Sequence, residues 1–219
     1  MLRCSTIDEF EELEHFKLLH RIEVSMNNGA YYDNRLKGQC QPGKTMSIIT
    51  DGWAVKRTTL PYLANKKEYS QEVHQHCQGC KVHGFRRSIH RTMPHISTGT
   101  NLNLTCLMDE ILAKIEYCEE NNKTFPTELL IQVDGGPENV SKAFLAFGEL
   151  LVRLNVFEKV ETNRLPVGHT HEDIDALFGS LWNFLKPHTI YTPQKFRELV
   201  EAAFGENQFI DTRKTDKKG

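Results

Sequence analysis

The chain has 219 residues, of which 39% are hydrophobic and 26% are charged, and its formal net charge is −2. These proportions are typical of a globular domain, and the near-neutral charge excludes binding of nucleic acid through an overall basic character. The sequence holds no run of about 18 apolar residues, which excludes a typical transmembrane helix. The acidic start, MLRCSTIDEFEELEHF, lacks the apolar segment of a secretory signal. Six scattered cysteines are typical of reduced thiols in an intracellular protein.

Apolar spacing and turn residues divide the chain into alternating helices and strands. In chain order we predict a helix (5–26), a loop (27–44), a strand (45–55), an irregular polar segment (56–80), a hairpin (81–97), a helix (102–123), a strand (128–134), a helix (139–157), a strand (158–167) and two helices (172–185 and 192–204). We interpret this order as an α/β domain over residues 45–204, preceded by a helical extension and loop (1–44) and followed by a disordered tail (205–219). Its sheet is expected to be mixed, with three early antiparallel strands, later parallel strands and helices on both faces.

Two aspartates hold equivalent positions at the ends of apolar strands. Asp51 and Asp134 each close such a strand and each precede a glycine. In an open α/β sheet, ligands gather outside the carboxyl ends of the strands, so neighbouring strands would place these carboxylates side by side. Adjacent carboxylates repel each other unless a divalent cation compensates, and Mg²⁺ or Mn²⁺ prefers such oxygen ligands. The alternative is ordinary turn chemistry, because an acid followed by glycine is also common in turns.

A third group of acids follows in the segment LPVGHTHEDID, which leads into a helix. Asp175 lies in the first turn of that helix, and Glu172 precedes it on the same face. Two strand-end aspartates and a helix carboxylate can hold two metal ions about 4 Å apart, the geometry of in-line phosphoryl transfer. We predict Asp175 as the third ligand, Glu172 as an accessory acid or helix cap, and Asp173 as solvent-facing.

Four strings carry a family resemblance: IITDGW, QVDGGPEN, IDALF and LPVGHTHEDID. Over about residues 45–190 the chain resembles the ribonuclease H-like core of DDE transposases and retroviral integrases. The last string is similar to that of an uncharacterised eukaryotic domain family thought to derive from such transposases. A Gly-Gly-Pro stands where Asn-Gly commonly follows the second aspartate of those enzymes.

The resemblance implies metal-dependent DNA strand cleavage or transfer, with Asp51, Asp134 and Asp175 holding two Mg²⁺ or Mn²⁺ ions. Near this centre, His171 could orient Asp175 or the phosphate, and His169 could move a proton. The alternative for both histidines is capping of the helix. Two other functions stay open: an inactive DNA-binding or scaffold module of the same fold, and a ribonuclease H acting on RNA–DNA hybrids.

Two further groups of residues suggest ligands. A C-x₂-C pair with neighbouring histidines could form a zinc site, against the alternative of a polar loop entering a strand; its residues are His76, Cys77, Cys80 and His83. Basic residues could contact phosphates, against the alternative of a solvated strand face; they are Lys56, Arg57, Lys81, Arg86, Arg87 and Arg91, with Asn139 as a further nucleic-acid contact. We expect a nuclear protein that binds DNA through this and other domains and not a membrane, with its oligomeric state open.

Overall fold

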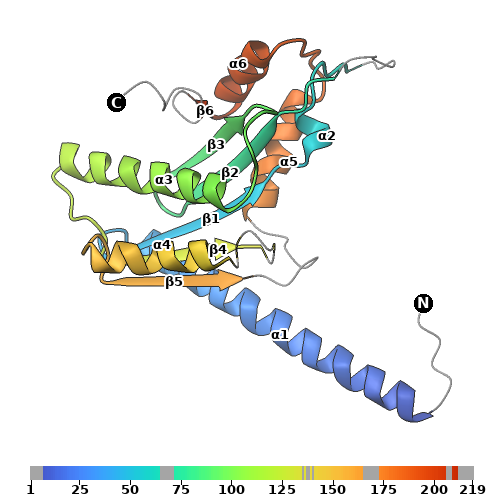
Figure 1. Cartoon of the computed structure of the whole chain (residues 1–219), viewed down its shortest axis with the longest axis vertical. Helices are drawn as coiled ribbons and strands as arrows, with labels where there is room; N and C mark the ends of the chain where they lie inside the picture. Colours follow the sequence, from blue (N-terminus) through green and yellow to red (C-terminus); the bar gives the residue numbers. More distant parts are fainter. Residues whose placement is uncertain are drawn as a thin grey trace.

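The computed structural model describes residues 7–64, 72–134, 136, 139, 141–164, 173–205 and 209–211. In this part of the chain the strands form one sheet in the order β5-β4-β1-β2-β3-β6 (Figure 1). The strands are β1 (Thr45–Gly52), β2 (His76–Val82), β3 (Arg86–Thr92), β4 (Glu128–Val133), β5 (Lys159–Arg164) and β6 (Phe209–Asp211). The helices are α1 (Ile7–Cys40), α2 (Val55–Thr58), α3 (Thr100–Glu120), α4 (Lys142–Arg153), α5 (Asp173–Leu185) and α6 (Pro193–Phe204).

The sheet is mixed. β2 pairs antiparallel with both β1 and β3. By contrast, β4 pairs in parallel with β1, and β5 pairs in parallel with β4. Helix α3 connects β3 to β4 and helix α4 connects β4 to β5, as parallel pairing requires a crossover. The predicted α/β class with a mixed sheet flanked by helices is therefore confirmed.

Each face of the sheet has its own hydrophobic core. Helices α3 and α4 pack on one face, where their buried residues join Ile48 of β1. Helices α5 and α6 pack on the other face, where their buried residues and Tyr31 of α1 join Ile49. The neighbouring residues Ile48 and Ile49 enter different cores because successive side chains of a strand point to opposite faces. The sheet is thus covered on both sides, and its strand ends are left for function.

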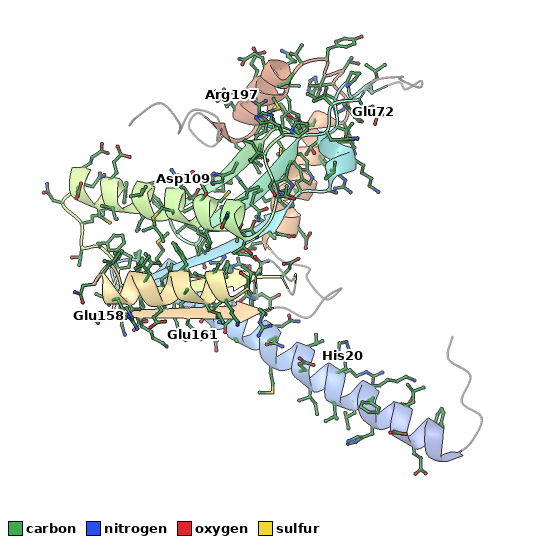
Figure 2. The ribbon with its side chains drawn as sticks, in the orientation of Figure 1. His20, Glu72, Asp109, Glu158, Glu161 and Arg197 are labelled. Carbon is green, nitrogen blue, oxygen red and sulfur yellow. The ribbon has the colours of Figure 1, made fainter. Side chains whose placement is uncertain are left out.

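Helix α1 corrects the predicted loop over residues 27–44, because it continues to Cys40. Tertiary contacts explain the difference: Tyr31 and Asn34 are buried, and Arg35 forms an ion pair with Asp173 of α5. Gly38 lets the helix approach the sheet, since a Cβ at this position would lie 2.7 Å from the Cβ of Ser47 in β1. The N-terminal part of α1, which includes His20, extends away from the sheet (Figure 2).

The C-terminal end also differs from the prediction. Residues 205–219 were expected to be disordered, but Phe209–Asp211 form β6, which pairs in parallel with β3. The edge of β3 explains this pairing, because an unpaired strand edge offers free backbone donors and acceptors. Residues 206–208 and 212–219 lie outside the described residues. Among the described helices, none combines the length and hydropathy that crossing a bilayer requires.

Candidate active site

A pocket of about 270 Å³ opens at the carboxyl ends of β1 and β4. Asp51 and Asp134 both line it. The other described residues of its lining are Gly52, His76, Gln78, Thr98, Gly99, Asn103 and Asn139. The lining is mainly polar, so the pocket suits a charged or hydrated ligand better than an apolar one.

The strand register brings the two aspartates together. In the parallel pair of β1 and β4, Ile48 lies opposite Ile131 and Ile49 opposite Gln132. Two residues further along each strand, the same register reaches Asp51 and Asp134. The structure therefore places side by side the two carboxylates that the sequence placed at equivalent strand ends.

The carboxylate of Asp134 is held by a short chain of hydrogen bonds. Its Oδ1 accepts bonds from the Gly136 backbone N–H (3.2 Å) and from the Asn139 side-chain amide (2.5 Å). Asn103 of α3 donates in turn to the Asn139 side-chain oxygen at 2.8 Å. Asn139 was predicted to contact nucleic acid, but it is buried and positions Asp134 instead. Among the described residues, both bonds to Asp134 reach Oδ1, so Oδ2 is available to a ligand.

The other side of the pocket carries Asp51 and His76. The Oδ1 atom of Asp51 accepts a hydrogen bond from the Gly52 backbone N–H at 2.7 Å. The His76 ring lies 3.3 Å from the Gln78 side-chain oxygen. Burial lowers the pKa of His76, only partly opposed by that hydrogen bond. The imidazole at the pocket is therefore mainly neutral near pH 7, and its Nε2 atom, which faces the Gln78 oxygen, carries the hydrogen.

The acids of α5 do not follow the prediction. Asp175 is exposed and is not among the described residues that line the pocket. Asp173 was predicted to face solvent, but its carboxylate is ion-paired with Arg35 (3.0 Å) and Lys81 (3.2 Å) and lies 3.4 Å from His83. Three cationic or titratable partners converge on Asp173 because the start of α5 packs beside α1 and the end of β2. The remaining predicted residues, His169, His171 and Glu172, lie outside the described residues.

The predicted zinc set does not converge. Cys77 packs in the core beneath α5 and α6, whereas Cys80 packs in the core beneath α3 and α4. They are three positions apart in β2, and an odd offset in a strand places side chains on opposite faces. His76 lines the pocket, whereas His83 contacts Asp173. The zinc site predicted from the C-x₂-C spacing is therefore wrong.

Internal contacts occupy much of the predicted basic patch. Arg86 is ion-paired with Glu110 through Nε (2.7 Å) and NH2 (3.0 Å). Arg91 is buried and donates to the Pro193 backbone carbonyl, and Lys81 is committed to Asp173. The hairpin therefore does not present the free cationic face that its sequence suggested.

The other basic residues of that prediction lie on different surfaces. The Arg87 guanidinium stacks 4.4 Å from the centre of the Phe204 ring, and that of Arg57 lies 5.4 Å from the Trp182 ring. Lys56 is exposed on α2. Lys56 and Arg57 of the predicted nucleic-acid contacts therefore lie at the surface, on α2 and not on the hairpin.

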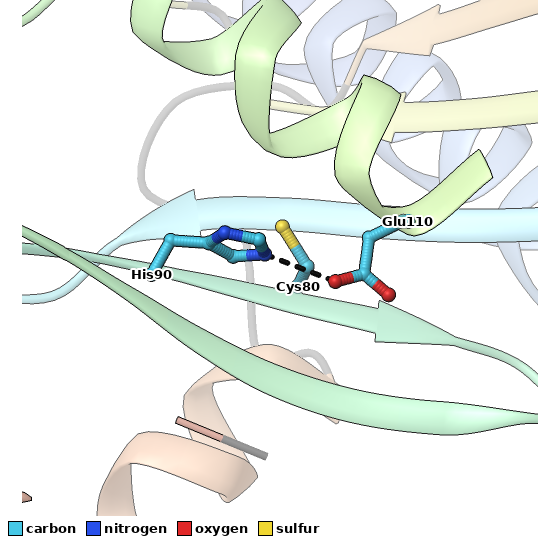
Figure 3. A group of neighbouring side chains, drawn as sticks. All are labelled: Cys80, His90 and Glu110. Carbon is cyan, nitrogen blue, oxygen red and sulfur yellow. Dashed lines mark hydrogen bonds and ion pairs between the residues drawn. The ribbon is translucent and has the colours of Figure 1, made fainter. Parts of the chain in front are cut away.

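Cys80, His90 and Glu110 form a buried cluster that was not predicted from the sequence (Figure 3). It lies between β2, β3 and α3, and the His90 Nε2 atom is 2.9 Å from Oε1 of Glu110. Neighbouring Cys80, Cys106 and Glu110 overcome the effect of burial and raise the pKa of His90 well above its usual value. Despite burial, His90 and Arg86 lower the pKa of Glu110 to about 2. One feature of the sequence could have indicated this cluster: Glu110 is a charged residue next to Ile111, which belongs to the apolar stripe of the predicted helix.

A family model for a domain of unknown function, DUF7869, matches residues 65–216. The chain belongs to the DUF7869 family. No curated protein matches the sequence. A solved structure, titled the crystal structure of NurA, is similar at 12% sequence identity, and the match covers 91% of this chain and 42% of that one. The chain thus spans less than half of NurA, and the TM-score of 0.21 is too low to show a shared fold.

Proposed function

We propose that this DUF7869 domain cleaves or transfers DNA strands at phosphodiester bonds in a metal-dependent reaction of the DDE type. The observation that carries the proposal is the pair Asp51 and Asp134, which stand at the ends of adjacent parallel strands and line one polar pocket. Ligands of open α/β sheets bind outside the carboxyl ends of strands, which is where this pocket opens.

The sheet order supports a ribonuclease H-like version of this fold. The resemblance to transposases implies three early antiparallel strands followed by parallel strands that alternate with helices. The order β5-β4-β1-β2-β3 has this arrangement, with β4 and β5 parallel to β1. Strand β6 is an addition at the opposite edge, beside β3.

The donor set of the pocket fits Mg²⁺ or Mn²⁺. Both ions prefer oxygen ligands, and two adjacent carboxylates are most stable when a cation lies between them. Asp51 and Asp134 would bind the ion, while Asn139 and Asn103 fix the orientation of Asp134. When bound, such an ion supplies positive charge that activates an attacking water or hydroxyl and stabilises the leaving oxygen. The neutral His76 ring is placed to accept the proton that the attacking group loses.

The third carboxylate of the site is Glu172 in this proposal and not Asp175. Asp175 is exposed and away from the pocket lining, and Asp173 is already neutralised by Arg35 and Lys81. Glu172 is therefore the remaining acid of the segment HEDID. Replacing each acid by its amide tests this choice, since only the ligand should be required for activity.

The central experiment is nicking of supercoiled plasmid DNA in Mn²⁺ by the wild-type chain and its amide variants. Asp51→Asn, Asp134→Asn and Glu172→Gln should each lower the rate by about a hundredfold or more, because each removes a metal ligand. Asp175→Asn should retain the wild-type rate. Asp33→Asn, an exposed acid on α1, is the matched control. Equal rates for wild type and Asp134→Asn would overturn the proposal, and faster cleavage of an RNA–DNA hybrid than of DNA would reassign the substrate.

One observation favours the alternative of a non-catalytic scaffold module: Asp173 of α5 and the basic residues Lys81 and Arg86 are engaged in internal contacts and are not free for a nucleic-acid substrate. Calorimetric titration with Mg²⁺ and Mn²⁺ separates the two functions. Binding that is lost in Asp134→Asn supports the enzyme, whereas no binding at millimolar metal supports the scaffold.

A further inference from the structure

The cluster of Cys80, His90 and Glu110 has the composition of a transition-metal site. One ligand atom from each residue lies within 4.8 Å of those of the other two. All three residues are completely buried, at 0% exposure. They come from three separate elements, β2, β3 and α3, and their side chains point toward one another (Figure 3).

Cys106 is the candidate for a fourth donor. It lies one helical turn before Glu110 on α3, is also completely buried, and is close enough to His90 to raise the pKa of the ring. It is not among the three residues whose ligand atoms lie within 4.8 Å of one another, so its thiol would have to move toward them. With that movement, two thiols, an imidazole and a carboxylate would surround the ion. Four such groups in a closed environment are the donor set of a structural zinc site, whereas Mg²⁺ and Ca²⁺ select oxygen ligands alone.

The surroundings of His90 provide an independent observation. Its Nδ1 atom is buried and has no hydrogen-bond partner among the described residues, and the same is true of Oδ2 of Asp109. These two atoms face each other at 3.6 Å. A metal-bound histidine commonly directs its second ring nitrogen at a carboxylate, which fixes the tautomer and the ring orientation.

Glu110 is also supported as a ligand would be. Arg86 Nε donates to its Oε2 atom at 2.7 Å, and the Ser88 hydroxyl donates to its Oε1 atom at 2.5 Å. Ligating carboxylates are usually held by such outer hydrogen bonds.

We propose that Cys80, Cys106, His90 and Glu110 bind one Zn²⁺ ion that joins β2, β3 and α3. Binding releases the His90 Nε2 proton and one proton from each thiol, so three protons leave as two positive charges enter. The two thiolates and the carboxylate carry three negative charges and the ion carries two positive charges. The site therefore has a net charge of −1, which Arg86 balances. This site is separate from the strand-end pocket and does not depend on the function proposed for it.

The test is refolding of the full chain from denaturant with Zn²⁺ present or with a chelator, because the buried site must load as the protein folds. Metal analysis should find about one zinc per chain, and Co²⁺ in its place should give the absorption bands of thiolate ligands in a tetrahedral site. Cys80→Ser and Cys106→Ser should each lower zinc affinity about tenfold or more and weaken those bands, because each leaves a single thiolate. Cys118→Ser, another buried cysteine of α3, is the control that should bind zinc as wild type does.

Thermal unfolding of the wild type keeps the result decisive if a cysteine variant fails to fold. Refolding with Zn²⁺ should raise the melting temperature of the wild type relative to refolding with chelator. A wild type that retains no zinc and melts at the same temperature in both cases overturns the proposal, as does a Cys80→Ser variant with wild-type zinc affinity and the full intensity of the thiolate bands.

Discussion

Two histidines of the β2–β3 hairpin are each buried beside a carboxylate, one on each face of the sheet, yet they behave oppositely. His83, just after β2, lies 3.4 Å from Asp173, and burial lowers its pKa to about 4. His90, in β3, lies 2.9 Å from Glu110, and its pKa is raised well above the usual value. The same pair of residue types therefore gives a neutral ring on one face and a charged ring on the other.

The difference comes from what else each carboxylate meets. Asp173 is already paired with Arg35 and Lys81, so little of its negative charge remains to favour a proton on His83. Glu110 is fully buried and close to His90, and the thiols of Cys80 and Cys106 add further acceptors. The number of cations that share a carboxylate, more than its presence, decides whether a buried histidine is charged.

The largest effect should come from breaking the His90 pair. Glu110→Ala leaves Arg86 and His90 beside an empty, buried position, and we expect the free energy of unfolding to fall by about 3–5 kcal/mol. Urea unfolding measures it. Glu119→Ala, an exposed glutamate of the same helix, should change stability by less than about 0.5 kcal/mol. A similar small loss for both variants would show that the Glu110 network is not a stabilising pair.

An intermediate effect concerns acid and the second histidine. Because the folded-state pKa of His83 lies below the usual 6.5, the unfolded chain binds its proton first as the pH falls. This contribution to stability is therefore intact above about pH 6.5 and is lost between that pH and about 4, with a slope of up to about 1.4 kcal/mol per pH unit. His83→Gln should reduce the slope in urea unfolding over that range, and the exposed control His188→Gln should leave it unchanged.

The groups that face His83 define what else could produce that slope. They are Tyr31 and Arg35 from α1, Ser47 from β1, Lys81 from β2 and Asp173 from α5. Burial and these cations lower the pKa of His83, and Asp173 only partly opposes them. An unchanged slope in His83→Gln would assign the acid sensitivity to another group.

The smallest effect should come from breaking the Asp173 cluster. Asp173→Asn removes the shared carboxylate, but the side chains of Arg35 and Lys81 are 36% and 30% exposed and can regain water. We expect a loss of about 1 kcal/mol in urea unfolding, because partly exposed ion pairs contribute little. A loss as large as that of Glu110→Ala would remove the distinction between the two faces.

The sequence predicted features that depend on local pattern. An apolar strand closed by Asp-Gly identified Asp51 and Asp134, while the pairing of their strands, which the sequence left open, comes from the structure. By contrast, Cys80, His90 and Glu110 meet only through the hairpin register, in which Cys80 lies opposite Ser88, and through the rotation of α3. The spacing of residues along the sequence indicates neither the hairpin register nor the rotation of α3. The C-x₂-C spacing failed for the same reason, since the pattern does not say that its residues lie in a strand.

Helix α1 shows that local helix propensity alone can also fail to predict a helix. Its Asn- and Gly-rich second half looks like a loop, but burial of Tyr31 and the ion pair of Arg35 stabilise it as helix. Such contacts join residues distant in sequence, and they routinely override weak local preferences.

The close approach of Gly38 to Ser47 has a mechanical consequence. A helix of 34 residues is about 50 Å long, and α1 packs on the domain near its C-terminal end, at Tyr31, Asn34, Arg35 and Gly38. Its other end is thus the tip of a stiff arm whose base rests on β1 and on the first residue of α5. A sideways load on the tip acts at the base with the leverage of that arm, so these few contacts bear the torque.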